Sequence, residues 1–324
     1  MNITAFSLNE IGGRKNVEDA IMPKNYTNQQ PKLFIVCDGV GGSSFGEVAS
    51  ELATKSYYEI FEKAVINTEN DFRQTLNHAL TLFQKRVLEF VEENPSASNT
   101  STTLTLLTIQ QDKAYAAWCG DSKIFQLRNG SPVFKSRDHS LVAELTAQGV
   151  ITAEEAETHP QRNIITRSLN SHTKQTDVEI AVLTDIQNED WFLLCTDGLM
   201  EQFTESLFPV MLNKFDAGTD YSKVIDKICY GKTKDNYSMY LLHLTQVKQG
   251  GSSKKLLVTF LVVLVLAIGG WFAYSQMNTK EEPPAATAVP DKKDTVQSIM
   301  MVRPQEEDTT NKKDSATKKD SIKK

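Results

Sequence analysis

Three aspartates in this sequence follow apolar runs, each with a glycine close by. Asp38 stands in FIVCDGVGG, Asp121 in AAWCGD and Asp197 in FLLCTDG. These contexts place each carboxylate at the rim of a core, where an isolated charge is costly to desolvate. A divalent cation would offset that cost, because Mg²⁺ and Mn²⁺ favour oxygen ligands. The pattern therefore predicts a metal site built from carboxylates that are far apart in the chain.

A plain turn is the alternative reading of each site, because Asp-Gly is a common turn signal. The threefold recurrence favours the metal hypothesis, and the glycine after Asp38 would let a backbone carbonyl approach a cation. Glu18, Asp19 and Asp235 are further acidic candidates. The glycine-rich run after Asp38 also suggests a phosphate-binding loop, but it lacks the Gly-Lys-Ser/Thr ending and the Rossmann spacing.

Strands and helices must position these carboxylates. Residues rich in β-branched, leucine and aromatic types predict six strands: Leu33–Cys37, Thr102–Ile109, Lys113–Trp118, Val178–Leu183, Asp190–Cys195 and Tyr237–Thr245. Apolar spacing predicts two long helices between the first two strands: Gly46–Val65 and Phe72–Val91. KAYAAWCGDSKIFQLRNG reads as a hairpin around Gly120. Antiparallel sheets covered by helices fit better than a doubly wound sheet, which needs a crossover helix after each strand.

Composition narrows the function classes. The chain has 324 residues, 40% of them apolar, and a formal net charge of −6. This acidic balance argues against a nucleic-acid partner, which would favour a basic surface. The four cysteines form no CxxC pair, so buried reduced thiols are expected rather than a zinc or redox motif. The N-terminus has neither the basic region nor the apolar run of a signal peptide.

The C-terminal quarter predicts a membrane anchor. We divide the chain into a folded domain (1–247), a polar linker (248–255), a transmembrane helix (256–277) and a charged, disordered tail (278–324). The segment LLVTFLVVLVLAIGGWFAY is long enough to cross a bilayer. A buried core helix is the alternative, but the flanking segments offer it nothing to pack against.

The expected orientation follows from the flanking residues. Lys254 and Lys255 precede the span, and with no signal peptide the domain is expected in the cytoplasm. The predicted location is thus the inner, cytoplasmic membrane, crossed once, with the tail outside.

With these residues in view, the chain resembles the metal-dependent protein serine/threonine phosphatases, the PPM or protein phosphatase 2C family, of bacterial type. The motifs occur in the family's order, and the first of them begins at Gly12. They are GGRKNVEDA, VCDGVGG with GEVAS, TSTTL, CGDSKIF, RDHSLVAEL, THPQRNIITRSL, LCTDGL and KDNYS. TSTTL stands where the family usually has GSTA. The set extends from residue 1 to about residue 247.

The resemblance implies an α+β fold. It would be a four-layer αββα sandwich of two antiparallel β-sheets flanked by helices, followed here by the single transmembrane helix. A metal cluster would lie at one end of the sandwich.

The resemblance also assigns ligands to a binuclear Mn²⁺ or Mg²⁺ centre. Asp38 would bridge the two ions, and the carbonyl of Gly39 would bind one of them. Asp197 and Asp235 would complete the first site, and Glu18 would hold the second ion through water.

Further roles follow from the same resemblance. Asp121 would join Asp197 at a third ion of the bacterial type, and Asp19 would be supportive. Arg14 would hold the phosphate, although a surface salt bridge is its alternative. Arg14 and Asp38 are thus the expected catalytic residues, acting with a metal-activated water that attacks phosphorus.

Some family members carry a histidine after the DG pair, where this chain has Val40. The proton donor is therefore expected to be a metal-bound water. His139 and His159 lie in matched motifs and are expected to be structural.

The leading hypothesis is hydrolysis of phosphoserine and phosphothreonine in proteins, on substrates of a serine/threonine kinase. One alternative is a catalytically silent, membrane-tethered relative that binds phosphoproteins; the presence of every expected ligand speaks against it. A calcium-binding module is the third, for which the acidic spacing is wrong.

Overall fold

The computed structural model describes residues 1–40, 45–246, 268 and 274. The chain separates into two compact units, Met1–Leu257 and Val258–Lys324. The strands are β1 (Asn2–Glu10), β2 (Asp19–Met22), β3 (Leu33–Val40), β4 (Ser101–Thr102), β5 (Leu104–Gln110), β6 (Lys113–Cys119), β7 (Lys123–Arg128), β8 (Ser131–Lys135), β9 (Glu179–Leu183), β10 (Trp191–Cys195) and β11 (Tyr237–Thr245). The α-helices are α1 (Gly46–Phe61), α2 (Glu69–Glu93), α3 (Leu141–Ala147), α4 (Ala153–Thr158), α5 (Asp197–Met200), α6 (Phe208–Met211) and α7 (Tyr221–Cys229). Three short 3₁₀ turns complete the elements: η1 (Pro95–Ala97), η2 (Gln175–Asp177) and η3 (Glu205–Leu207).

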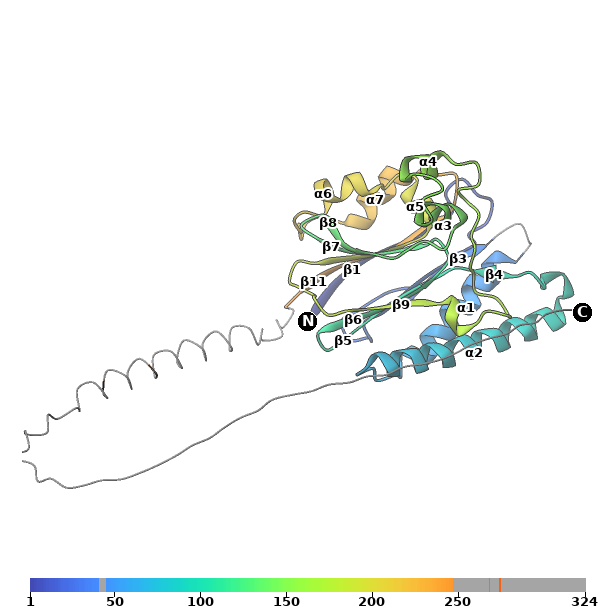
Figure 1. Ribbon diagram of the computed structural model, residues 1–324, viewed down its shortest axis with the longest axis horizontal. Coiled ribbons are helices and arrows are strands. Elements are labelled where there is room, and N and C mark those ends of the chain that lie inside the picture. The colour runs from blue at the N-terminus through green and yellow to red at the C-terminus, as the bar shows by residue number, and fades with distance from the viewer. Residues whose placement is uncertain (41–44, 247–267, 269–273, 275–324) are drawn as a thin grey trace, which may run out of the picture. The chain divides into compact units, whose positions relative to one another are not determined.

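The strands form two sheets that lie face to face (Figure 1). One has five strands in the order β1-β11-β10-β7-β8, and the other has the order β2-β3-β5-β6-β9, with β4 paired to β3. Neighbouring strands are antiparallel throughout. The predicted antiparallel architecture is therefore confirmed.

The core between the sheets follows from the alternation of side chains along each strand. Phe34 and Val36 of β3 face the five-stranded sheet, where they pack with Phe192 of β10 and Tyr240 of β11. The Phe34 and Tyr240 rings lie 5.1 Å apart, edge to face. Asp38 is two residues beyond Val36, so its side chain points to the same face of β3 as those of Phe34 and Val36. Its carboxylate therefore lies at the end of the core between the sheets.

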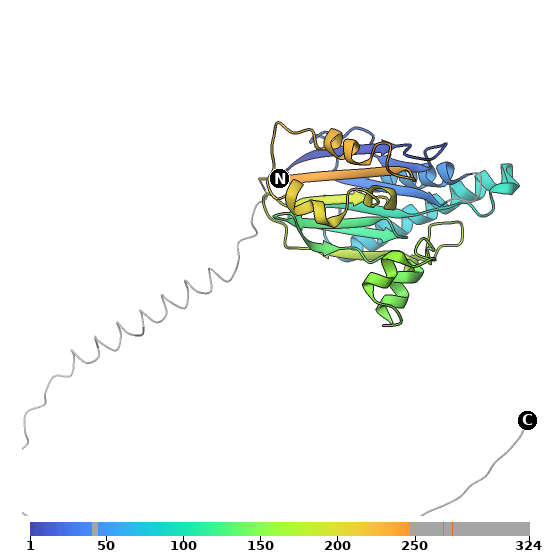
Figure 2. The same ribbon diagram turned by 90° about the horizontal axis from the view of Figure 1, so that it is seen from above.

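Helices cover the outer faces of both sheets. Figure 1 shows α1 and α2 against the sheet of β3, and Figure 2 shows the same layers from above. Phe72, Leu76 and Phe83 of α2 pack with Leu33 and Ile35 in one buried cluster. A second cluster joins the other sheet to α5, α6 and α7. The four-layer αββα arrangement follows, and all four cysteines are buried and free, as expected.

Two predictions about elements were wrong. The segment around Gly120 is not a hairpin, because β6 pairs with β5 and β9 while β7 pairs with β10 and β8 in the other sheet. Gly120, with a φ of +108°, turns the chain from one sheet to the other. The predicted helix Gly46–Val65 ends at Phe61.

Among the described residues, none of the helices combines the length and the apolar character needed to span a bilayer. Apart from Ile268 and Tyr274, the predicted span (256–277), the linker (248–255) and the tail (278–324) lie outside the described part of the chain.

Candidate metal centre and active site

Asp38 is held through its backbone near the end of β3. Its N–H donates to the Thr103 hydroxyl at 2.9 Å, and its carbonyl accepts from the Thr103 N–H at 2.8 Å. The Thr102 hydroxyl donates to the same carbonyl at 2.7 Å. These bonds use only the backbone of Asp38 and leave its carboxyl group to interact with other side chains at the end of the strand.

Gly39 lies where three chain segments meet. Its N–H donates to the Glu18 carbonyl at 3.1 Å. A Cβ at Gly39 would lie 2.3 Å from the Gly46 carbonyl oxygen and 2.7 Å from the Glu18 carbonyl oxygen. No side chain fits there, so glycine is what allows Glu18 and Asp38 to share one end of the sheet.

Asp197 and Asp235 join Asp38 from the opposite sheet. Asp197 opens α5, with one residue between it and β10, and its side chain lies within hydrogen-bonding reach of the Asp38 carboxyl. A Cβ at Gly198 would lie 3.1 Å from the Cβ of Asp235, which brings the third carboxylate into the same group. The structure therefore brings Asp38, Asp197 and Asp235 to the same region, and their role as metal ligands stays a prediction.

Burial and mutual repulsion raise the pKa values of the carboxyls in this group. Burial raises the pKa of Asp38 well above its ordinary value, and four neighbouring negative charges act in the same direction: Asp19, Asp197, Asp121 and Asp235. Burial also raises the pKa of Asp121 to about 7, and that of Asp197 is raised for the same reason. The ionised form of each of these carboxyls is disfavoured by burial, and a bound cation would stabilise that form.

The fit to a metal rests on an unpartnered ligand atom. Asp197 Oδ1 is buried and has no hydrogen-bond partner in the described part of the chain. As the side chains stand there, no three of the histidine, cysteine or acidic residues are already arranged as a metal cage. The reason is local: Asp38 bonds to Asp197, and Asp235 bonds to Arg14. The donors fit a divalent ion in type and place, and the bonds between them are those that a cation would replace.

Arg14 places a positive charge beside Asp235. Its guanidinium donates to Asp235 Oδ2 at 2.5 Å, with half of its side chain exposed. The hydrogen bond to Asp235 is the main reason that the pKa of Arg14 is raised. An exposed cation beside the carboxylates is well placed to meet an incoming anion.

Asp19 is opposite Asp38 in the β2–β3 register. Its Oδ2 accepts from the Thr196 hydroxyl at 2.9 Å, and burial raises its pKa to about 7. Its hydrogen bond therefore ties the strand of Glu18 to the segment that leads into Asp197.

Sequence analysis did not single out Asn236. Its side-chain carbonyl accepts from the Glu18 N–H at 2.8 Å, and its Nδ2 donates to the carbonyls of Ile11 and Asn16 at 2.7 and 2.9 Å. It thus fastens the Arg14 loop to the Asp235 segment. The DN pair in KDNYS was the available signal.

The two histidines contact backbone amides. His139 Nδ1 accepts from Gly120 N–H at 3.2 Å, and its own N–H donates to the Gly120 carbonyl at 2.9 Å. His159 ends α4 and accepts from Gln161 N–H at 3.2 Å. These bonds fit the structural roles predicted for both.

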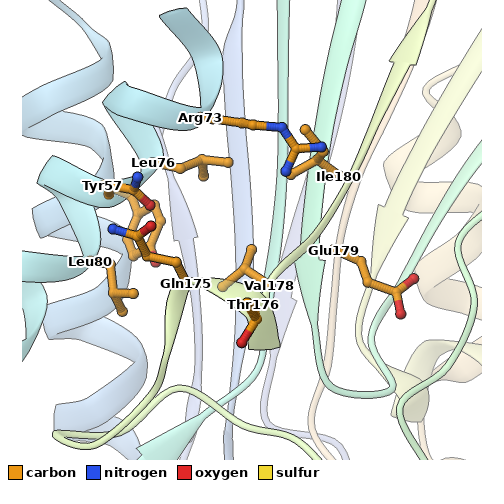
Figure 3. A pocket seen from close by; sticks show the side chains of 10 residues that line it. Tyr57, Arg73, Leu76, Leu80, Gln175, Thr176, Val178, Glu179 and Ile180 are labelled. Atoms are coloured by element: carbon orange, nitrogen blue, oxygen red, sulfur yellow. The ribbon is translucent and has the colours of Figure 1, made fainter. Parts of the chain in front are cut away.

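Two cavities in the described part of the chain are not lined by Asp38, Asp197 or Asp235. One of about 460 Å³ lies between α2 and β9; Figure 3 shows Leu76 on the α2 side and Ile180 opposite, with the Arg73 side chain extending from α2 toward Ile180. Another, of about 540 Å³, is lined in part by Asp19 and Glu47. Hydrogen bonds and charge interactions place the carboxylates together.

Comparison with known proteins decides the family. The family model described as protein phosphatase 2C matches residues 13–229, more than half of the chain. The chain belongs to the protein phosphatase 2C family. Protein phosphatase PhpP of Streptococcus pneumoniae is similar over 196 residues at 32% identity, covering 60% of this chain and 78% of the relative. This member of the family is therefore a serine/threonine protein phosphatase.

Solved structures of family members share the fold. The S. agalactiae serine/threonine phosphatase has a TM-score of 0.65 at 25% identity, covering 75% of this chain and all of that one (100%). The catalytic domain of the serine/threonine protein phosphatase PstP, solved with two manganese ions, has a TM-score of 0.62 at 23% identity, covering 75% and 99%. The second likeness is one of fold.

Proposed function

We propose that this protein phosphatase 2C member hydrolyses phosphoserine and phosphothreonine in proteins at a binuclear divalent-metal centre. One observation carries the proposal. Asp38, Asp197 and Asp235 come from three distant segments and meet at one end of the sandwich, where burial raises the pKa of the first two. A bound cation would stabilise such a group, to which the chain itself contributes the positive charges of Arg14 and Lys123.

The proposed ligands follow from that arrangement. Asp38, the Gly39 carbonyl, Asp197 and Asp235 would hold one ion. Asp38 would also serve the second ion, which Glu18 would hold through water. Glu18 suits this role because its backbone is fixed to both Gly39 and Asn236.

Asp121 is proposed to join Asp197 at a third ion. Burial and the charge of Asp197 raise its pKa, which places the two carboxylates within each other's influence. The metals are Mn²⁺ or Mg²⁺, since both favour oxygen ligands. The two manganese ions in the structure of PstP support Mn²⁺.

Bound divalent ions would lower the pKa of a water and stabilise charge on phosphoryl oxygens. The residues of this chain do the rest. Arg14 turns its planar fork from Asp235 to two oxygens of the phosphate and orients it. The ionised carboxylate of Asp38 stays at the metal centre while the phosphoryl group is transferred to water. Val40 contributes no proton, so solvent at the centre protonates the leaving group.

The substrates are proposed to be phosphoproteins that a serine/threonine kinase modifies, with no role for nucleic acid. The names of the relatives support this class, because PhpP and the Listeria proteins are called protein or serine/threonine phosphatases. The silent alternative loses support, because each ligand predicted from the sequence is present.

The activity test uses the full chain in detergent and peptides that carry phosphoserine, phosphothreonine or phosphotyrosine. We expect Mn²⁺-dependent release of phosphate from the first two and none with a chelator. Asp38→Asn should abolish release, whereas Asp112→Asn, at an exposed turn between β5 and β6, should not. Metal-independent turnover, or a normal rate in Asp38→Asn, would refute the proposal.

We also propose that residues 256–277 tether the phosphatase to the inner membrane, with the domain in the cytoplasm and the tail outside. The uncharged apolar run supports this. The full chain should co-sediment with phospholipid vesicles, and deletion of 256–277 should release it with its activity intact. Equal sedimentation of the deletion variant would contradict the tether.

A further inference from the structure

Thr103 lies between the two segments that carry Asp38 and Asp121. Its hydroxyl accepts from Asp38 N–H at 2.9 Å and lies 2.7 Å from the hydroxyl of Ser122. Thr103 and Ser122 are each only 1% exposed. One hydroxyl therefore connects the backbone of the first segment to a side chain of the second, away from solvent.

The methyl group of Thr103 contacts the same second segment. A Cβ at Gly120 would lie 2.6 Å from Thr103 Cγ2 and 2.8 Å from its Cβ. Gly120 therefore has no side chain at the point where Thr103 packs against it, and Asp121 is the next residue. The methyl group fills the space beside Gly120, whereas the hydroxyl makes the hydrogen bonds to both segments.

A hydroxyl can accept and donate at once, so the Thr103 hydroxyl can accept from the Asp38 N–H and share a second hydrogen bond with Ser122, in which either hydroxyl can donate. Its acceptor capacity is taken by an amide that cannot move without shifting Asp38. Its bond to Ser122 then sets the distance between the two segments. No other residue type of this shape makes both bonds, because valine has the same outline without the hydroxyl.

We propose that Thr103 is a positioning residue, whose hydroxyl fixes the Asp38 segment relative to the Asp121 segment and so sets the spacing of the metal ligands. The inference rests on the proposed function, since spacing matters only if these carboxylates share a metal centre. Residues that orient metal ligands commonly change metal affinity by about 10–100-fold when replaced.

Three variants of the full chain separate positioning from packing. Thr103→Val removes the hydroxyl and keeps the outline, and Thr103→Ser keeps the hydroxyl and removes the methyl group. Thr105→Val is the matched control, because Thr105, two residues further along at the start of β5, is a buried threonine like Thr103. Its hydroxyl donates to the Val36 carbonyl at 2.8 Å, two residues before Asp38.

The readouts are Mn²⁺ binding by calorimetry and thermal unfolding with a chelator. Thr103→Val should bind Mn²⁺ about tenfold more weakly, while Thr103→Ser and Thr105→Val should bind as the wild type does. Thermal unfolding of the two valine variants should shift to lower temperature by similar amounts.

Normal Mn²⁺ binding by Thr103→Val, or an equal loss in Thr105→Val, would overturn the positioning role and leave the proposed function in place. Absence of Mn²⁺ binding in the wild type would overturn both.

Discussion

Arg14 pairs with the carboxylate of Asp235, which is proposed to bind metal. The two roles proposed for them are compatible only if the guanidinium exchanges Asp235 for the phosphate of the substrate. Half of the Arg14 side chain is exposed, which gives it room to do so. Removing this arginine should therefore affect the substrate and the metal in opposite directions.

Arg14→Ala should lower kcat/KM for a phosphopeptide about 100-fold, because a donor to the phosphoryl oxygens is lost. Its Mn²⁺ affinity should equal or exceed that of the wild type, because Asp235 loses a competing partner. Steady-state kinetics and calorimetry measure the two effects. Lys15→Ala, at the exposed neighbouring position, is the control. Weaker Mn²⁺ binding by Arg14→Ala would contradict this assignment.

The carboxyl pKa values give a pH dependence with a definite sign. Burial raises the pKa of Asp19 and of Asp121 to about 7 in the folded protein, whereas an unfolded chain has ordinary carboxyls near pH 4. Without metal, the folded state binds more protons in this window, so the stability that these groups support is present at low pH and is lost as pH rises toward 7.

The rise in melting temperature on adding Mn²⁺ should thus be larger at pH 8 than at pH 6, because protons compete with the ion at the lower pH. Thermal unfolding with chelator and with Mn²⁺ at both pH values measures the difference. Equal shifts at pH 6 and pH 8 would mean that the ion does not displace these protons.

At the scale of elements, periodicity predicted the long helices and central strands. Apolar spacing found α2, although the helix begins at Glu69 and ends at Glu93. The strand β1 was missed because only Ile3 and Leu8 of its side chains are buried, too few to signal alternation. The supposed hairpin at Gly120 failed because residue pattern shows that strands exist but not which sheet each one joins.

The start of α2 offers a test of how this helix is fixed. Thr68 and Asp71 form a reciprocal capping box, with Asp71 N–H donating to the Thr68 hydroxyl at 3.1 Å. Thr68→Ala should lower the free energy of unfolding by about 1 kcal/mol and leave phosphatase activity unchanged. Thr81→Ala, exposed within the same helix, should be neutral or slightly stabilising. Chemical denaturation compares them, and equal losses would contradict the capping role.

At the scale of the whole molecule, the site exists only because two sheets stack with their strand ends together. Local pattern suggested that Asp38, Asp121 and Asp197 end strands, but it could not show that β3, β6 and β10 end at one side. That came from the resemblance, and the fold bears it out. Thr103 and Asn236 were not predicted as positioning residues. Their hydrogen bonds join residues far apart in the sequence, and a local motif does not indicate such bonds.

The most direct measurement is a crystal structure of the phosphatase grown with Mn²⁺, with the ions located by anomalous scattering. The account predicts two ions about 3.5–4 Å apart, with the Asp38 carboxylate between them, Asp197 and Asp235 on one ion, and Arg14 released from Asp235. Ions bound elsewhere, or a crystal soaked in Mn²⁺ in which Asp38 still bonds to Asp197 with no ion between them, would contradict it.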